Sequence, residues 1–173
     1  IEPAAPSKIF QGVTTEVVGN CGCSAAPRGS KARMPSDWQE FDYPGKWETL
    51  AEYRALLERS RPAVNCAMLV GHNNLRASVM GYENRRADSD DLKEMSRLLA
   101  ESLDEGAMGL STGLLYSPGM FAAREEVLAL AKVVTHHRGI YTSHMRSEGA
   151  ELLEAVDETI GVGAETGCRV EIS

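Results

Sequence analysis

The sequence lacks a surplus of positive charge and any long hydrophobic run. Lysine and arginine together number 18 against 25 aspartate and glutamate residues, which leaves a formal net charge of -7. Nucleic acids and anionic membranes are bound through clustered cationic side chains, so this balance argues against both and favours a small-molecule or protein partner. No apolar run approaches the roughly 18–20 residues that span a bilayer, and the first residues carry no basic segment before an apolar core. Secretion and membrane insertion are therefore disfavoured.

Cysteine is scarce, and an initiator methionine is missing. The four cysteines, at positions 21, 23, 66 and 168, form no dense regular framework. They therefore fit reduced thiols in a cytoplasmic protein better than a disulfide scaffold. The 173 residues begin at Ile1 and stop at Ser173, so we expect an excerpt of a longer polypeptide. The composition, 43% hydrophobic and 25% charged, is ordinary for a soluble globular protein.

Short apolar or β-branched runs alternate with longer amphipathic segments, which is typical of repeated β-α units. We predict an α/β fold with five strands, at 13–18, 64–70, 107–111, 140–143 and 169–172. Connections of this length favour a parallel sheet, in either a doubly wound sheet or a β/α barrel. Five strands cannot close an eight-stranded barrel. No internal repeat or linker divides the chain, so we expect one structural unit over residues 1–173.

Apolar residues recur every three or four positions between these strands, which predicts helices with one face on the sheet. A further helix is predicted from Glu48 to Arg59, and Ser89 before two aspartates marks a helix start. Residues 27–46 show no clean period and predict a long loop that covers a site. The recurring apolar positions are Leu92, Met95, Leu98 and Leu99, then Val127, Leu128, Ala131 and Val134, then Leu152, Val156 and Ile160.

Chemistry in a parallel β/α fold collects at the carboxyl ends of the strands. Cys21 and Cys23 follow the first predicted strand, and His144 ends the fourth. A thiolate at Cys21 and an imidazole at His144 that face one pocket could bind zinc. Spacing alone favours simpler roles, because a Cys-x-Cys pair also suits a tight turn and a single histidine is more often structural.

Three more polar residues follow the predicted strands. His72 could orient a substrate or make a loop-stabilising hydrogen bond. Tyr116 could donate a hydrogen bond to an oxygen that gains negative charge, or it could be a rim tyrosine. Arg146 could bind a carboxylate or pair with Glu148. The remaining cysteines and histidines are expected to be buried thiols and helix-end residues: Cys66, Cys168, His136 and His137.

The motifs at these strand ends resemble those of the N-acyl-D-amino-acid deacylases, the D-aminoacylase branch of the amidohydrolase superfamily. The resemblance runs almost end to end and keeps motif order through residues 11–22, 70–76, 109–116 and 141–148. It implies a metal-dependent β/α barrel of the TIM type. The five predicted strands then become barrel strands 2 to 6 of a catalytic barrel, with strand 1 and strands 7 and 8 absent.

The resemblance also implies roles for individual residues. It makes Cys21 and His144 zinc ligands and Tyr116 a donor to the tetrahedral oxyanion, with Arg146 and His72 as candidate substrate-binding residues. The family's His-x-His pair, its next zinc histidine and its proton-shuttle aspartate have no counterpart in the sequence. The implied reaction is zinc-dependent hydrolysis of N-acyl-D-amino acids, giving a carboxylate and a D-amino acid. We expect it of the full-length protein, and expect these residues alone to be inactive.

Two alternatives stay open at the level of sequence. One is another metal-dependent amidohydrolase, such as a cyclic-amide hydrolase of the dihydroorotase type. The other is a non-catalytic module, because part of the metal shell is missing. An open five-strand segment would also expose apolar surface and unpaired strand edges, so we expect the isolated segment to self-associate.

Overall fold

The computed structural model describes residues 3–33 and 45–173, and in these ranges five parallel strands form one sheet. The strands lie in the order of the chain, from β1 to β5. All five predicted strands are confirmed to within a few residues. Their bounds are β1 Thr15–Val18, β2 Asn65–Gly71, β3 Gly109–Gly113, β4 Ile140–His144 and β5 Arg169–Ile172.

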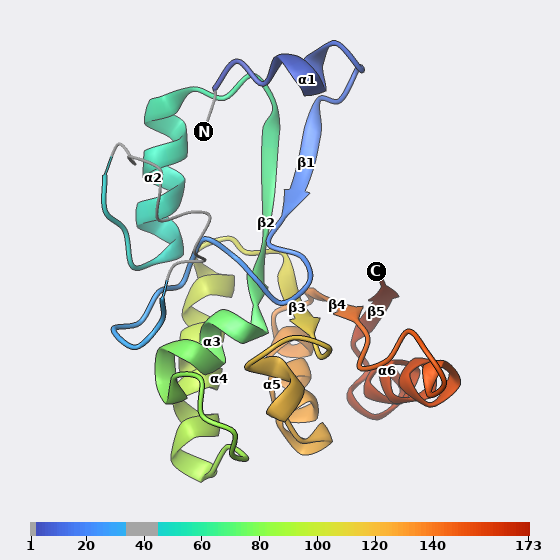
Figure 1. Ribbon diagram of the computed structural model, residues 1–173. Helices are drawn as coiled ribbons and strands as arrows, with labels where there is room; N and C mark the ends of the chain where they lie inside the picture. The colour runs from blue at the N-terminus through green and yellow to red at the C-terminus, as the bar shows by residue number, and fades with distance from the viewer. Residues whose placement is uncertain (1–2, 34–44) are drawn as a thin grey trace.

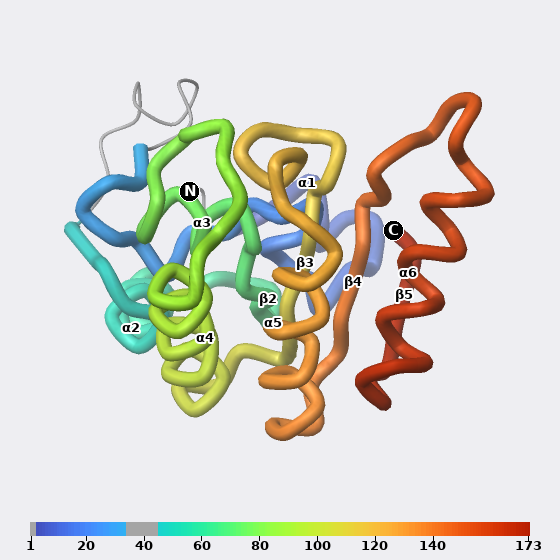
Figure 2. Tube along the Cα trace, turned by 90° about the horizontal axis from the view of Figure 1, so that it is seen from below, coloured from blue at the N-terminus to red at the C-terminus, as the bar shows by residue number. Residues whose placement is uncertain are grey.

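Helices connect successive strands of this sheet (Figure 1). The order of strands never reverses among the described residues, whereas a doubly wound sheet reverses its order at a switch point. Figures 1 and 2 show α4, α5 and α6 following one another beside the sheet. The fold is therefore a sector of a β/α barrel. The helices are α1 Pro6–Ile9, α2 Leu50–Ser60, α3 His72–Met80, α4 Ser89–Asp104, α5 Arg124–His136 and α6 Leu152–Thr166, with a 3₁₀ turn at Gly119–Phe121.

Local sequence sets where the helices begin. Helix α4 begins at Ser89, as predicted, and is capped by Asp88, whose side chain accepts hydrogen bonds from the backbone amides of Asp90 and Asp91. Thr49 and Glu52 cap each other at the start of α2, close to the predicted boundary. Helix α3 was not predicted, because it starts at His72 directly after β2 without a turn. Residues 34–44 of the predicted long loop lie outside the described residues.

The main core lies between the sheet and the helices α3 to α6. Met95 and Leu99 of α4 and Val127 of α5 are buried in it, as their spacing predicts. The predicted face of α6 is wrong, since Ile160 is 57% exposed. A Cβ at Gly163 would lie 2.6 Å from Val170 Cγ2. Helix α6 therefore approaches the sheet through small residues and turns its larger apolar side chains outward.

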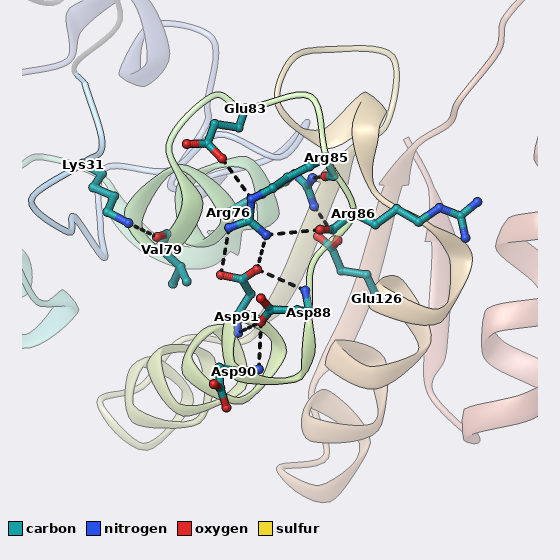
Figure 3. A network of polar contacts seen from close by, with 10 residues as sticks. All are labelled: Lys31, Arg76, Val79, Glu83, Arg85, Arg86, Asp88, Asp90, Asp91 and Glu126. Carbon is teal, nitrogen blue, oxygen red and sulfur yellow. Dashed lines mark hydrogen bonds and ion pairs between the residues drawn. The ribbon is translucent and has the colours of Figure 1, made fainter.

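A buried charge network joins three of these helices. His72 Nε2 of α3 lies 2.7 Å from Glu126 Oε1 of α5, and Arg76 donates to the other carboxylate oxygen. None of the three side chains is more than 2% exposed. Arg76 also donates to the carbonyl of Arg85, whose Nη2 lies 3.2 Å from Asp91 Oδ1 in the first turn of α4 (Figure 3). The network therefore links α3 and α5 to the start of α4.

No described helix combines the length and the apolar character that crossing a membrane requires.

We predict that Glu126→Gln destabilises the protein in a pH-dependent way. Burial raises the pKa of the Glu126 carboxyl, but the hydrogen bonds and charges of His72 and Arg76 outweigh it and leave the pKa below its ordinary value. The carboxylate thus contributes stability above the unfolded pKa of about 4.3 and loses it as pH falls through the lower folded value. Breaking a buried charge pair costs about 3–5 kcal/mol, so we expect a loss of that size in urea unfolding at pH 7.

The neighbouring Glu125→Gln is the matched control, because Glu125 is exposed. The difference between the parent and Glu126→Gln should shrink as pH falls below about 4.3, the unfolded pKa. A difference that stays constant with pH would contradict this account.

Candidate metal centre

The carboxyl ends of β1 to β4 bring the first predicted pair of residues together. Cys21 follows β1 and His144 ends β4, and Cys21 Sγ lies 3.5 Å from His144 Nδ1. Zinc binds sulfur at about 2.3 Å and imidazole nitrogen at about 2.0–2.1 Å, so two tetrahedral ligands lie about 3.5–3.6 Å apart. The structure thus shows the predicted meeting of these side chains at a separation that suits a shared zinc ion.

The other ring nitrogen of His144 is also engaged. Nε2 lies 3.0 Å from Glu148 Oε1. If Nε2 carries the proton and donates to this carboxylate, Nδ1 keeps a lone pair toward the Cys21 sulfur. A metal-binding histidine commonly donates its second nitrogen to a carboxylate in this way, which fixes the ring and its tautomer. Sequence reasoning missed this role of Glu148.

The two side chains do not make a complete metal site. Within residues 3–33 and 45–173, no group of three or more histidine, cysteine, aspartate or glutamate side chains could hold a metal ion. A catalytic zinc generally has three protein ligands and an open position. Cys21 and His144 are therefore an incomplete donor set among the described residues.

Tyr116 lies beside the same histidine. Its hydroxyl is 3.4 Å from His144 Nε2, and the two rings meet edge to face with centroids 4.8 Å apart. The side chain is 45% exposed, so the hydroxyl can reach a bound molecule. The loop after β3 places it there, since Tyr116 donates its amide to the Gly113 carbonyl at 3.1 Å.

Arg146 binds the carboxylate of a residue other than Glu148. Its guanidinium forms a two-pronged ion pair with Glu158 of α6, with both distances 3.0 Å. It also donates to the carbonyls of Met120 and Ala122. The predicted pair with Glu148 is wrong, because Glu148 faces His144. Arg146 thus ties the end of β4 to the loop that follows Tyr116 and to α6.

His72 is not on the accessible surface of the strand ends. Its side chain has no exposed area and contacts Glu126. The described contacts therefore favour the structural role over a substrate contact. This corrects the assignment of His72 to substrate binding, and the reason is that α3 turns the ring into the core.

The remaining thiols divide between core and surface. Cys168 is buried, as predicted, but Cys66 of β2 is exposed. Burial of part of Cys66 and the charge of Glu16 raise the pKa of its thiol. Cys23 and Cys66 line an apolar cavity of about 460 Å³ between α2 and the first two strands. His137, directly after α5, contacts Asp104 at the end of α4. This contact fits the structural role predicted for His137.

The turn that carries Cys21 requires glycine on both sides. Gly19, Cys21 and Gly22 have φ values of 85°, 54° and 77°. A Cβ at Gly22 would lie 2.5 Å from the Gly113 amide nitrogen, and a Cβ at Gly113 would lie 2.2 Å from the Cys21 carbonyl oxygen. The turn therefore lies directly on the end of β3, without space for a side chain between them.

Comparison with known proteins identifies relatives of this arrangement. D-aminoacylase from Alcaligenes xylosoxydans xylosoxydans is 40% identical over 168 residues, which are 96% of this chain and 34% of that enzyme. N-acyl-D-glutamate deacylase from the same organism is 38% identical over 172 residues, 99% of this chain and 35% of that enzyme. No family model matches the chain.

Solved structures give the same result. A crystal structure of D-aminoacylase, described as defining a novel subset of amidohydrolases, has a TM-score of 0.86 at 39% identity, over 95% of this chain and 35% of that one. The N-acyl-D-glutamate deacylase of Bordetella bronchiseptica was solved with zinc and a phosphonate that mimics the tetrahedral intermediate. It has a TM-score of 0.89 at 37% identity, over 98% of this chain and 36% of that one.

The fold and the strand-end residues thus define a sector of an amidohydrolase barrel. Within that class, the predicted resemblance to the N-acyl-D-amino-acid deacylases is confirmed by sequence and by structure. The chain spans about a third of the length of the curated relatives it matches, 34% and 35%.

We predict that Gly22→Ala destabilises the protein more than Gly12→Ala does. Both glycines have a φ of 77°, but a Cβ at Gly12 meets no atom within 4 Å. The left-handed conformation alone costs alanine about 1–2 kcal/mol, and the contact at Gly22 adds about 1–3 kcal/mol of overpacking. Urea unfolding measures both variants. Equal losses would show that the close approach to β3 carries no cost.

Proposed function

We propose that this chain is part of a zinc-dependent hydrolase that cleaves the amide bond of N-acyl-D-amino acids. The observation that carries the proposal is the 3.5 Å approach of Cys21 Sγ to His144 Nδ1, in a chain that is 35–40% identical to three deacylases of this class. The products are a carboxylic acid and a free D-amino acid. Because the named relatives act on N-acyl-D-amino acids, the cyclic-amide alternative is not favoured.

In this proposal, Cys21 and His144 hold the zinc together with ligands from outside the described residues. A thiolate with an imidazole is a donor set that suits zinc better than a hard oxygen-binding cation. When bound, zinc supplies a Lewis acid that polarises the scissile carbonyl and lowers the pKa of water. Glu148 holds the His144 ring in the orientation that points Nδ1 at the Cys21 sulfur.

Tyr116 acts on the substrate in this proposal. Its exposed hydroxyl lies at the edge of the Cys21 and His144 pair, where it can donate to the carbonyl oxygen as negative charge develops there. Arg146 donates hydrogen bonds to the carbonyls of Met120 and Ala122, which follow Tyr116 in the chain. It therefore supports the position of the Tyr116 loop, while its own guanidinium is already occupied by Glu158.

The five strands take the places of barrel strands 2 to 6 in the proposed enzyme. The remaining strands and metal ligands then belong to the two thirds of the relatives' length that this chain does not cover. Four further statements stay predictions. They are the cytoplasmic location, the absence of nucleic-acid and membrane partners, the self-association of this segment alone, and its inactivity alone.

The Cys21 assignment can be tested in the full-length protein. Cys21→Ala should lose zinc and deacylase turnover by more than the roughly 10–100-fold that removal of a residue behind a metal ligand costs. Cys66→Ala is the control, because Cys66 is exposed on β2 away from His144. Zinc content by elemental analysis and hydrolysis of an N-acyl-D-amino acid are the two measurements. Unchanged zinc and rate in Cys21→Ala would refute the ligand assignment.

Tyr116→Phe should separate metal binding from catalysis. Loss of one well-placed donor to a developing oxyanion costs about 10²–10³ in turnover, while zinc content should stay the same. Tyr82→Phe is the control, because Tyr82 is also 45% exposed and its hydroxyl contacts only the Arg33 backbone among the interactions described. Turnover in Tyr116→Phe that equals the control would remove Tyr116 from the mechanism.

A further inference from the structure

The turn that carries Cys21 holds an unfavourable backbone conformation. Cys21 has a φ of 54°, in the left-handed region that is unfavourable for a residue with a side chain. Such a conformation persists only where the surrounding structure determines it. The position of the Cys21 sulfur next to His144 thus depends on the contacts that hold the turn. The glycines allow the left-handed conformation but do not favour it over other conformations.

Ser111 of β3 bridges the two ends of the turn. The Gly22 amide donates to Ser111 Oγ at 3.1 Å, and Ser111 Oγ donates to the Gly19 carbonyl at 2.5 Å. The side chain has no exposed area. Because one hydroxyl serves both bonds, it sets the distance between the residues that flank Asn20 and Cys21.

Thr142 of β4 holds the middle of the same turn. Its hydroxyl donates to Asn20 Oδ1 at 2.8 Å, next to Cys21 in the chain. Thr142 is the register partner of Ser111 across β3 and β4, so the two hydroxyls lie side by side on one face of the sheet. The period-two alternation of a strand puts His144 on that same face, two residues beyond Thr142.

We propose that Ser111 and Thr142 are positioning residues for the metal centre. They fix the left-handed Cys21 turn so that the thiol is already placed at His144 Nδ1 before a metal ion binds. Neither side chain contacts the Cys21 sulfur or the His144 ring in the hydrogen bonds described, so each acts through the backbone of the turn or through Asn20. This inference rests on the proposed zinc site and adds residues that act behind its ligands.

The experiment replaces each hydroxyl in the full-length protein and loads it with Co²⁺ in place of zinc. The variants are Ser111→Ala and Thr142→Val, and the second keeps nearly the same side-chain volume. Ser78→Ala and Thr159→Val are matched controls. Ser78 Oγ accepts from the Gly29 amide at 2.8 Å, and the Thr159 hydroxyl donates to Ala155 within its own helix at 3.0 Å. The measurements are Co²⁺ affinity by chelator competition, thiolate-to-cobalt absorption and the unfolding midpoint.

We expect both site variants to bind Co²⁺ about 10–100-fold more weakly, the range for residues that orient metal ligands. Their thiolate-to-cobalt absorption per bound ion should also fall. The controls should bind like the parent even where they unfold at lower urea concentration. If Ser111→Ala does not fold, Thr142→Val decides the matter alone.

Two negative results are distinguishable. A parent protein that shows thiolate-to-cobalt absorption, with site variants that match the controls in affinity and absorption, would overturn the positioning role alone. A parent protein that binds Co²⁺ without any thiolate absorption would overturn the zinc assignment of Cys21, and the positioning role with it.

Discussion

The close approach of the Cys21 turn to the strand ends is the constraint on which the site depends. The turn lies against two strands at once, because a Cβ at Gly71 of β2 would lie 2.4 Å from the Gly22 carbonyl oxygen and a Cβ at Gly113 of β3 would meet the Cys21 carbonyl. Gly113 is also the register partner of His144. The missing side chain at Gly113 therefore lets a thiol from β1 reach an imidazole on β4 across two intervening strands.

The helix that follows β2 supports the same edge of the sheet from behind. Asn73 donates its backbone amide to the Gly22 carbonyl at 2.9 Å, and the Asn74 amide group makes two hydrogen bonds of 2.8 Å with the backbone of Ser24. His72 on the same helix turn contacts Glu126 in the core instead. Residues 72–74 thus contact both the buried charge network and the cysteine turn, which couples the core to the site.

Much of this architecture follows from sequence patterns. The five strands are predictable because short apolar or β-branched runs are bounded by glycines. The meeting of Cys21 and His144 follows because parallel strands end at a common edge. The partner of Arg146 is not predictable, since Glu158 comes from a helix whose rotation depends on packing. For the same reason, the apolar periodicity of α6 does not predict its buried face, because small residues such as Gly163 face the sheet. The contact between Glu148 and His144 is not predictable from sequence, because it depends on the side-chain geometry of His144.

The central claim is that the Cys21 sulfur and the His144 imidazole share one zinc ion. Zinc-edge X-ray absorption of the zinc-loaded, full-length protein measures this directly, because sulfur and nitrogen neighbours scatter differently and lie at different distances. The account predicts a sulfur neighbour at about 2.3 Å with nitrogen or oxygen neighbours at about 2.0–2.2 Å. A spectrum with nitrogen and oxygen neighbours alone would contradict it.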